Sequence, residues 1–217
     1  MTVVRHALVL TLVAAAVATG LAAPSLSAPA PITIAAQPAD LLRDRRLTLY
    51  GSIPSNRLKE IVVLEARDCG QSFYRQVARV ETTAGGRWVW PYFTPGISAS
   101  IRASWNGRKS APVRVRDRAY VELRQAGPRG FSVSVRAKFP LAGKRVHLQR
   151  LDPARGWTTV TSAELTTGGA PPGSTYVFST ARLTASLPAG SLVRGLVTAA
   201  QARPCYLSGR SNMLRIP

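Results

Sequence analysis

The stretch Gly143-Lys-Arg-Val-His-Leu-Gln-Arg150 decides the fold class of this chain. Its apolar residues alternate with polar ones, as they do in a strand that buries one face, so Val146 and Leu148 are predicted to point into a core. Most of the chain consists of similar short runs separated by Gly, Pro, Asn and Ser, with almost no helical periodicity. This pattern predicts an all-β protein.

An earlier segment, Lys59-Glu-Ile-Val-Val-Leu-Glu65, matches that stretch without a gap. The alignment predicts that Ile61 and Val63 face inward. The match continues from Tyr74-Arg-Gln-Val77 to Trp157-Thr-Thr-Val160, which have an aromatic residue and a valine at the same spacing. Because similarity at a fixed separation indicates an internal repeat, the chain is predicted to contain one structural unit twice.

Aromatic residues recur in the next strand of both copies. Trp88 and Trp90 correspond to Tyr176 and Phe178, and each pair alternates along the chain. Cores readily accept aromatic side chains, so all these residues, together with Trp157, are predicted to pack inside. A sugar-stacking platform is the less favoured alternative, because no converging polar groups can be placed beside them.

The repeat predicts two tandem domains, residues 31–117 and 118–217. The segment between them, Asp117-Arg-Ala119, contains neither Gly nor Pro and runs from strand to strand. Such a short connection leaves little freedom, so a fixed end-to-end arrangement is expected.

The repeated pattern resembles the immunoglobulin-like and fibronectin type III-like repeats of secreted bacterial proteins. Gly143 to Arg150 and Trp157 carry the resemblance in the second copy, whereas the first copy has Leu58, Glu65 and Tyr74 at three of these positions. The resemblance implies two tandem seven-stranded immunoglobulin-like β-sandwiches and no particular activity. The expected strands are 32–42, 47–53, 59–66, 73–80, 87–92, 100–105 and 112–116, then 120–124, 131–139, 144–151, 157–163, 175–180, 192–198 and 212–216.

Residues 1–30 have the plan of a secretory signal peptide. A positively charged start is followed by an apolar run over 7–23 and by small residues up to Ala30. This plan predicts export, so the mature protein is expected to be secreted or associated with the cell envelope. An uncleaved membrane anchor is the alternative, and no second apolar run suggests a membrane span after the leader.

The chain is strongly basic, with 29 Lys and Arg against 10 Asp and Glu, a net charge of +19. Such a charge attracts polyanions. Outward positions of the predicted strands place arginines on one face of the sheet in each domain, which predicts a polyanion-binding strip. Its six candidate residues are Arg102, Arg114, Arg116, Arg145, Arg194 and Arg215. The alternative is that these are ordinary polar surface positions of an arginine-rich chain.

Catalytic and metal-binding patterns are missing from the sequence. After the leader the single histidine is His147, and no carboxylate is placed to orient it as a general base. No pair of acids stands out, and two cysteines with one histidine give no zinc-like spacing. We therefore expect neither enzymatic activity nor a cofactor.

Each of the two cysteines lies in an insertion that the other copy lacks. Cys69 lies in a loop two residues longer than its counterpart, and Cys205 lies in a ten-residue extension. In the expected topology both loops lie at the junction near Asp117, so an inter-domain disulfide is predicted in an oxidising compartment. Two free thiols are the alternative.

The sequence therefore predicts an exported, non-catalytic module for binding or spacing in the bacterial cell envelope. Its expected partners are an anionic envelope polymer, contacted through the basic sheet face, or another envelope protein, and not nucleic acid. The alternative is a recognition or accessory module that partners a secreted enzyme.

Overall fold

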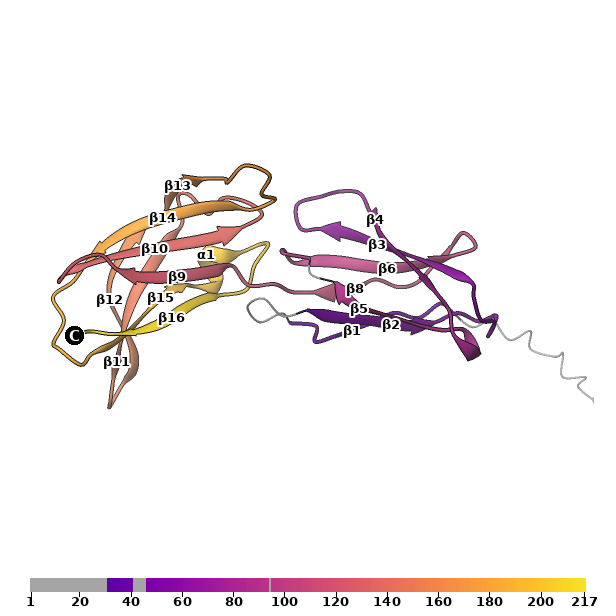
Figure 1. Ribbon diagram of the computed structural model, residues 1–217, viewed down its shortest axis with the longest axis horizontal. Coiled ribbons are helices and arrows are strands. Elements are labelled where there is room, and N and C mark those ends of the chain that lie inside the picture. The colour runs from indigo at the N-terminus through magenta and orange to yellow at the C-terminus, as the bar shows by residue number, and fades with distance from the viewer. Residues whose placement is uncertain (1–30, 41–45, 94) are drawn as a thin grey trace, which may run out of the picture.

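The computed structural model describes residues 31–40, 46–93 and 95–217, which form antiparallel sheets with very little helix (Figure 1). The predicted all-β class is confirmed. The predicted signal peptide lies outside the described residues. Two halves, β1–β8 and β9–β16, lie end to end along the long axis of the molecule (Figure 1).

The N-terminal half forms two sheets. One has the order β1-β2-β5, and the other has the order β4-β3-β6-β7, with β8 paired to β6. The strands of this half are β1 (Ala35–Gln37), β2 (Leu47–Ser52), β3 (Ile61–Asp68), β4 (Arg75–Glu81), β5 (Arg87–Phe93), β6 (Ala99–Trp105), β7 (Arg108–Lys109) and β8 (Val113–Val115).

The C-terminal half also forms two sheets, with the orders β13-β14-β10-β9 and β12-β11-β15-β16. Its strands are β9 (Tyr120–Gln125), β10 (Gly130–Ala137), β11 (Arg145–Asp152), β12 (Gly156–Glu164), β13 (Thr166–Gly169), β14 (Val177–Thr184), β15 (Leu192–Val197) and β16 (Gly209–Arg215). The short strands β7 and β13 have no counterpart among the seven strands expected in each copy.

The extension that contains Cys205 holds a single turn of helix, α1 (Ala199–Ala202). Thr198 caps its first turn, because its hydroxyl accepts a hydrogen bond from the backbone N–H of Gln201 at 3.3 Å. No described helix is long and apolar enough to cross a membrane.

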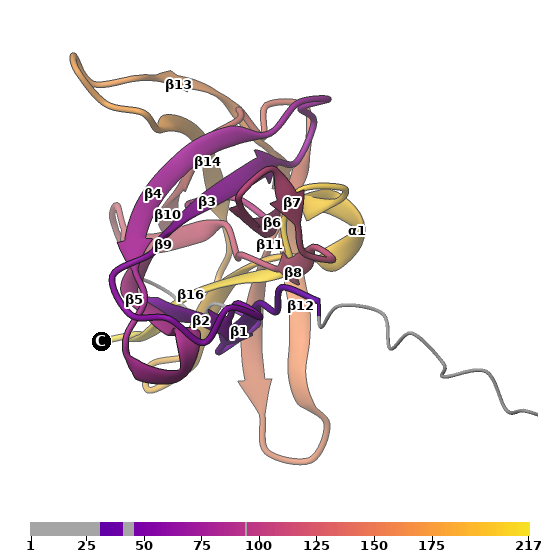
Figure 2. The ribbon, with the colours of Figure 1, turned by 90° about the vertical axis from the view of Figure 1, so that its right-hand side faces the viewer.

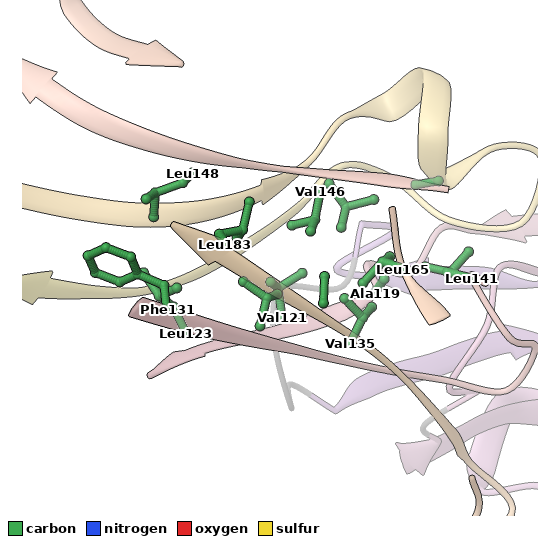
Figure 3. Packing of buried hydrophobic residues seen from close by; sticks show 14 of the residues in the cluster. Ala119, Val121, Leu123, Phe131, Val135, Leu141, Val146, Leu148, Leu165 and Leu183 are labelled. Carbon is green, nitrogen blue, oxygen red and sulfur yellow. The ribbon is translucent and has the colours of Figure 1, made fainter. Parts of the chain in front are cut away.

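Buried apolar side chains form one cluster in each half. The larger cluster fills the space between the two C-terminal sheets, with Phe131 and Leu148 toward one end and Val135 toward the other (Figure 3). Ile97 belongs to this cluster although it lies in the N-terminal half, just before β6. The C-terminal core therefore extends across the junction between the halves.

The inward residues of β3 differ from the prediction. Val62, Leu64 and Ala66 are buried, whereas Ile61 is 38% exposed and Val63 is only partly buried. The predicted inward pair is therefore wrong by one residue. In β11 the predicted residues, Val146 and Leu148, are indeed buried.

Matching β-bulges show which residues of the two strands correspond. The pairing of β3 with β4 shifts between Leu64 and Glu65, and the pairing of β11 with β12 shifts between Leu148 and Gln149. Leu64 of β3 is therefore structurally equivalent to Leu148 of β11. The gapless sequence alignment instead matched Leu64 with Gln149, one residue further along. A run of four apolar residues, 61–64, has no alternation that could have revealed the shift.

The aromatic residues of the second copy are also placed differently from the prediction. Trp88 is buried, but Tyr176 and Phe178 are only partly buried and lie outside the core cluster. In β14 the residues that fill the core are Ser179, Ala181 and Leu183. Because side chains alternate along a strand, Phe178 must point to the outer face of its sheet.

Candidate functional site

A disulfide joins the two halves. Cys69 follows β3, Cys205 lies between α1 and β16, and their sulfur atoms are bonded with the Cα atoms 5.3 Å apart. The predicted pairing is confirmed. Because the bond connects positions 136 residues apart, it fixes the end of one half against the other.

Backbone hydrogen bonds surround the disulfide. Ser98 donates its N–H to the carbonyl oxygen of Cys205 at 3.1 Å, and its own carbonyl oxygen accepts from the N–H of Cys69 at 2.9 Å. Leu207 donates to the carbonyl oxygen of Asp117 at 2.8 Å. The residues around the disulfide are therefore hydrogen-bonded to Ser98, just before β6, and to Asp117, in the link between the halves.

Tyr206 is a second contact of the junction. It is buried, its hydroxyl oxygen accepts from the backbone N–H of Lys138 at 2.8 Å, and it donates to the carbonyl oxygen of Gly96 at 3.5 Å. Burial raises the pKa of Tyr206 to about 12, so the hydroxyl stays neutral. The ammonium of Lys138 lies 3.2 Å from Asp68, which adds an ion pair between the halves.

A cavity of about 490 Å³ lies beside this junction. Four arginines line it: Arg67, Arg114 and Arg116 from the N-terminal half and Arg203 from the C-terminal half. The sequence predicted two of them, Arg114 and Arg116, as binding residues. It missed Arg67 and Arg203, although both lie within two residues of a cysteine that was predicted to reach the junction.

The charge of this cavity is positive. Arg116 forms a two-point ion pair with Asp40 at 2.7 and 2.9 Å. Asp68 accepts from Lys138 and from Arg75 through one oxygen, Oδ2, at 3.2 Å each, and its buried Oδ1 has no partner among the described residues. Arg67 lies over the ring of Tyr74 at 5.1 Å. Within residues 31–40, 46–93 and 95–217, the guanidinium groups of Arg114 and Arg203 have no hydrogen bond, ion pair or ring contact. These two groups are therefore available to an anion.

Arg102, another predicted binding residue, is held within the protein. Its Nε lies 2.6 Å from the carboxylate of Glu65, and its guanidinium lies 3.8 Å from the centroid of the Tyr74 ring. Only 21% of the side chain is exposed. Arg67 lies over the same ring at 5.1 Å. The carboxylate and the ring occupy Arg102, which leaves it little capacity for a ligand.

Arg194 occupies the matching position in the C-terminal half. Its Nε donates to Gln149 at 3.0 Å, and its guanidinium lies 4.0 Å from the centroid of the Trp157 ring. Burial and the nearby charge of Arg210 lower the pKa of Arg194. Trp157 was predicted to pack inside, but it lies outside the core cluster and covers this arginine.

The last two predicted arginines are exposed on the C-terminal half. Arg145 donates to the hydroxyl of Ser162 at 3.4 Å, and Arg215 donates to the carbonyl oxygen of Gly190 at 3.3 Å. In both views β3 and β4 lie toward the top, whereas the hairpin of β11 and β12 points to the bottom (Figures 1 and 2). Of the six predicted arginines, only Arg114 and Arg116 line the junction cavity.

His147 lies partly buried on β11, opposite Ser162 of β12 and Leu196 of β15. No carboxylate stands opposite it in either pairing. In the part of the chain that the structure describes, no group of three His, Cys, Asp or Glu side chains could hold a metal ion.

No family model and no curated protein matches this chain. Among the 86 solved chains that match is a purple acid phosphatase isolated from yellow lupin (Lupinus luteus) seeds. The likeness covers 83% of this chain and 40% of the phosphatase, with 10% identity and a TM-score of 0.36. This chain thus spans less than half of the phosphatase, and a likeness at that TM-score carries no argument about fold or function.

Proposed function

We propose that this protein is an exported, non-catalytic module of two tandem immunoglobulin-like sandwiches, residues 31–117 and 118–217, that binds anionic groups of a bacterial envelope polymer at the junction. The observation that carries the proposal is the junction cavity. It combines arginines of both halves, and two of them, Arg114 and Arg203, have no partner among the described residues.

The chemistry of the cavity suits phosphate or carboxylate. Guanidinium groups bind these anions through paired hydrogen bonds, and such bonds are stronger than those between neutral groups. A volume of about 490 Å³ lies within the usual range of small-ligand sites, so one charged unit of a polymer would fit. The disulfide between Cys69 and Cys205 holds the two walls of the cavity in register.

The strand order supports the sandwich interpretation. The C-terminal sheets, β13-β14-β10-β9 and β12-β11-β15-β16, match the two sheets of an immunoglobulin-like domain with one added edge strand. In the N-terminal half β1-β2-β5 and β4-β3-β6 follow the same order. Binding at the contact between such domains agrees with the general placement of function in loops and at domain edges.

Export is supported by two independent features. The first is the charged, then apolar, then small-residue plan of residues 1–30. The second is the disulfide, since such bonds persist in oxidising compartments outside the cytosol.

A protein partner is the second candidate, in which the chain acts as an accessory module of a secreted enzyme. Exposed apolar side chains on the outer face of the β12-β11-β15-β16 sheet favour it. Leu151 is paired with Trp157, and Met213, which is 62% exposed, is paired with Arg194. Apolar contacts of this kind persist at high salt, whereas contacts between arginines and a polyanion weaken.

The test is retention of residues 31–217 on heparin resin and on purified envelope polymer as the salt concentration rises. The proposal predicts retention at low salt and release at high salt. Passage through both resins unretarded at low salt would overturn it. Capture of one secreted enzyme that persists at high salt would favour the second candidate.

A further inference from the structure

A second cavity, of about 720 Å³, lies on the outer face of the β13-β14-β10-β9 sheet. We call it the hydroxyl groove. Its floor consists of side chains that point away from the core because their neighbours, such as Val133 and Ala181, are buried. The floor residues are Glu122, Ser132, Ser134 and Thr180, from β9, β10 and β14.

The side of the hydroxyl groove is built where the chain passes from β12 to β13. Leu165 is buried in the core, which turns its neighbours Glu164 and Thr166 toward the groove. Phe178 also lines it. A Cβ atom at Gly168 would lie 2.9 Å from Thr180 and 3.3 Å from Phe178, so only glycine lets β13 approach β14 this closely.

Several polar groups of the groove have no partner within the protein. Among the described residues, the side chains of Ser132, Ser134, Glu164 and Arg182 form no hydrogen bond or ion pair. Glu122 accepts from Arg124 at 2.9 Å. The groove therefore offers free hydroxyls, a free carboxylate and a free guanidinium beside one aromatic ring, which is the mixture of donors and acceptors that a hydroxyl-rich ligand needs.

The charges of the groove cancel. Two carboxylates, Glu122 and Glu164, face two guanidinium groups, Arg124 and Arg182, in a protein whose net charge is +19. A polyanion would meet carboxylates here and would find stronger attraction at other surfaces. The groove therefore favours a ligand that is recognised by hydrogen bonds and apolar contact rather than by charge.

We propose that the hydroxyl groove binds a neutral saccharide. The ring of Phe178 would pack against the apolar face of a pyranose. The carboxylate of Glu164 would accept from sugar hydroxyls, and Ser132, Ser134 and Arg182 would complete the hydrogen bonds. This site is separate from the junction cavity, so either can fail without the other.

The experiment is a titration of residues 31–217 with neutral hexasaccharides of glucose, xylose and N-acetylglucosamine, followed by saturation-transfer NMR and calorimetry. Two variants change the groove: Phe178→Ala removes the aromatic surface, and Ser134→Phe fills the floor. Ser104→Phe is the matched control, because Ser104 is also a partly buried, outward serine in the middle of a sheet, on β6 in the other half. Each variant is first checked for an unchanged unfolding transition.

At least one hexasaccharide is expected to bind with an affinity that does not change between low and high salt, since no charge is neutralised. Phe178→Ala should weaken it about fivefold to tenfold, as expected for an aromatic contact. Ser134→Phe should abolish binding, and Ser104→Phe should leave it unchanged. Absence of binding to all three sugars, or binding that both groove variants retain, would overturn the proposal. Loss of heparin retention with intact sugar binding would contradict only the junction proposal.

Discussion

The guanidinium carbon of Arg194 lies 4.0 Å from the centroid of the Trp157 ring, and Arg102 lies in the same way over Tyr74 at 3.8 Å. In each half the arginine also bonds to a residue at the bulge of the neighbouring strand, Glu65 or Gln149. Each half thus contains one arginine that stacks on an aromatic ring. In both halves this arginine lies on the outer face of a sheet.

Because of this contact, replacing Arg102 should destabilise the protein more than replacing the exposed Arg114. Arg102→Ala should lower the free energy of unfolding by about 2 kcal/mol, because it leaves Glu65 partly buried without its charged partner. Arg114→Ala should change it by less than about 0.5 kcal/mol, as for an ordinary surface residue. Urea unfolding followed by tryptophan fluorescence measures both. Equal effects of the two substitutions would contradict the assigned roles.

Loss of the disulfide should lower the free energy of unfolding more than either arginine substitution does. Replacing Cys69 and Cys205 with serine should destabilise the protein by about 3–5 kcal/mol, because the unfolded chain loses a long covalent loop. Urea unfolding of the variant, and of the wild type with and without reductant, measures this loss. Two reactive thiols in the unfolded but unreduced wild type would show that the bond does not form.

Tyr206 predicts how the junction responds to alkali. Its pKa is raised from the ordinary 10.0 to about 12 in the folded protein. Between these values the unfolded tyrosine has lost its proton while the folded one keeps it, so stability is full below pH 10 and falls as the pH rises toward 12. The loss should reach about 3 kcal/mol above pH 12.

The measurement is the free energy of unfolding at pH 9 and near pH 11.5. Tyr206→Phe is the matched variant: it loses the hydrogen bond from Lys138 at every pH but removes the ionisable group. Its free energy of unfolding should therefore be lower than that of the wild type at pH 9 and should fall less between pH 9 and pH 11.5. Identical declines in both proteins would assign the effect to other groups.

Sequence patterns were sufficient for the fold class and for the cysteine pair. The strands around Val146 alternate clearly, and the two insertions with cysteines show where the repeats differ. The inward face of β3 was predicted wrongly, because the apolar run 61–64 does not alternate and so could not show that the gapless alignment was off by one residue. Local periodicity is therefore reliable only where polar residues interrupt it.

The candidate binding residues were predictable only in part. Outward positions of strands identify which arginines leave the core, but not which ring or carboxylate occupies them. Arg102 and Arg194 are paired across strands with residues distant in sequence, and Arg203 lines the same cavity as Arg114 only through the packing of two halves. Such contacts depend on three-dimensional register, which one sequence does not reveal.

The central claim is that the junction, and not the bulk charge, binds anionic polymer. The most direct test compares the salt dependence of heparin binding for two double variants with equal charge. One is Arg114→Ala with Arg203→Ala at the junction; the other is Arg129→Ala with Arg155→Ala, in the exposed turns before β10 and before β12. The junction variant should bind about tenfold or more weakly and reduce the salt slope by about two, while the turn variant stays close to the wild type. Equal losses in both variants would contradict the account.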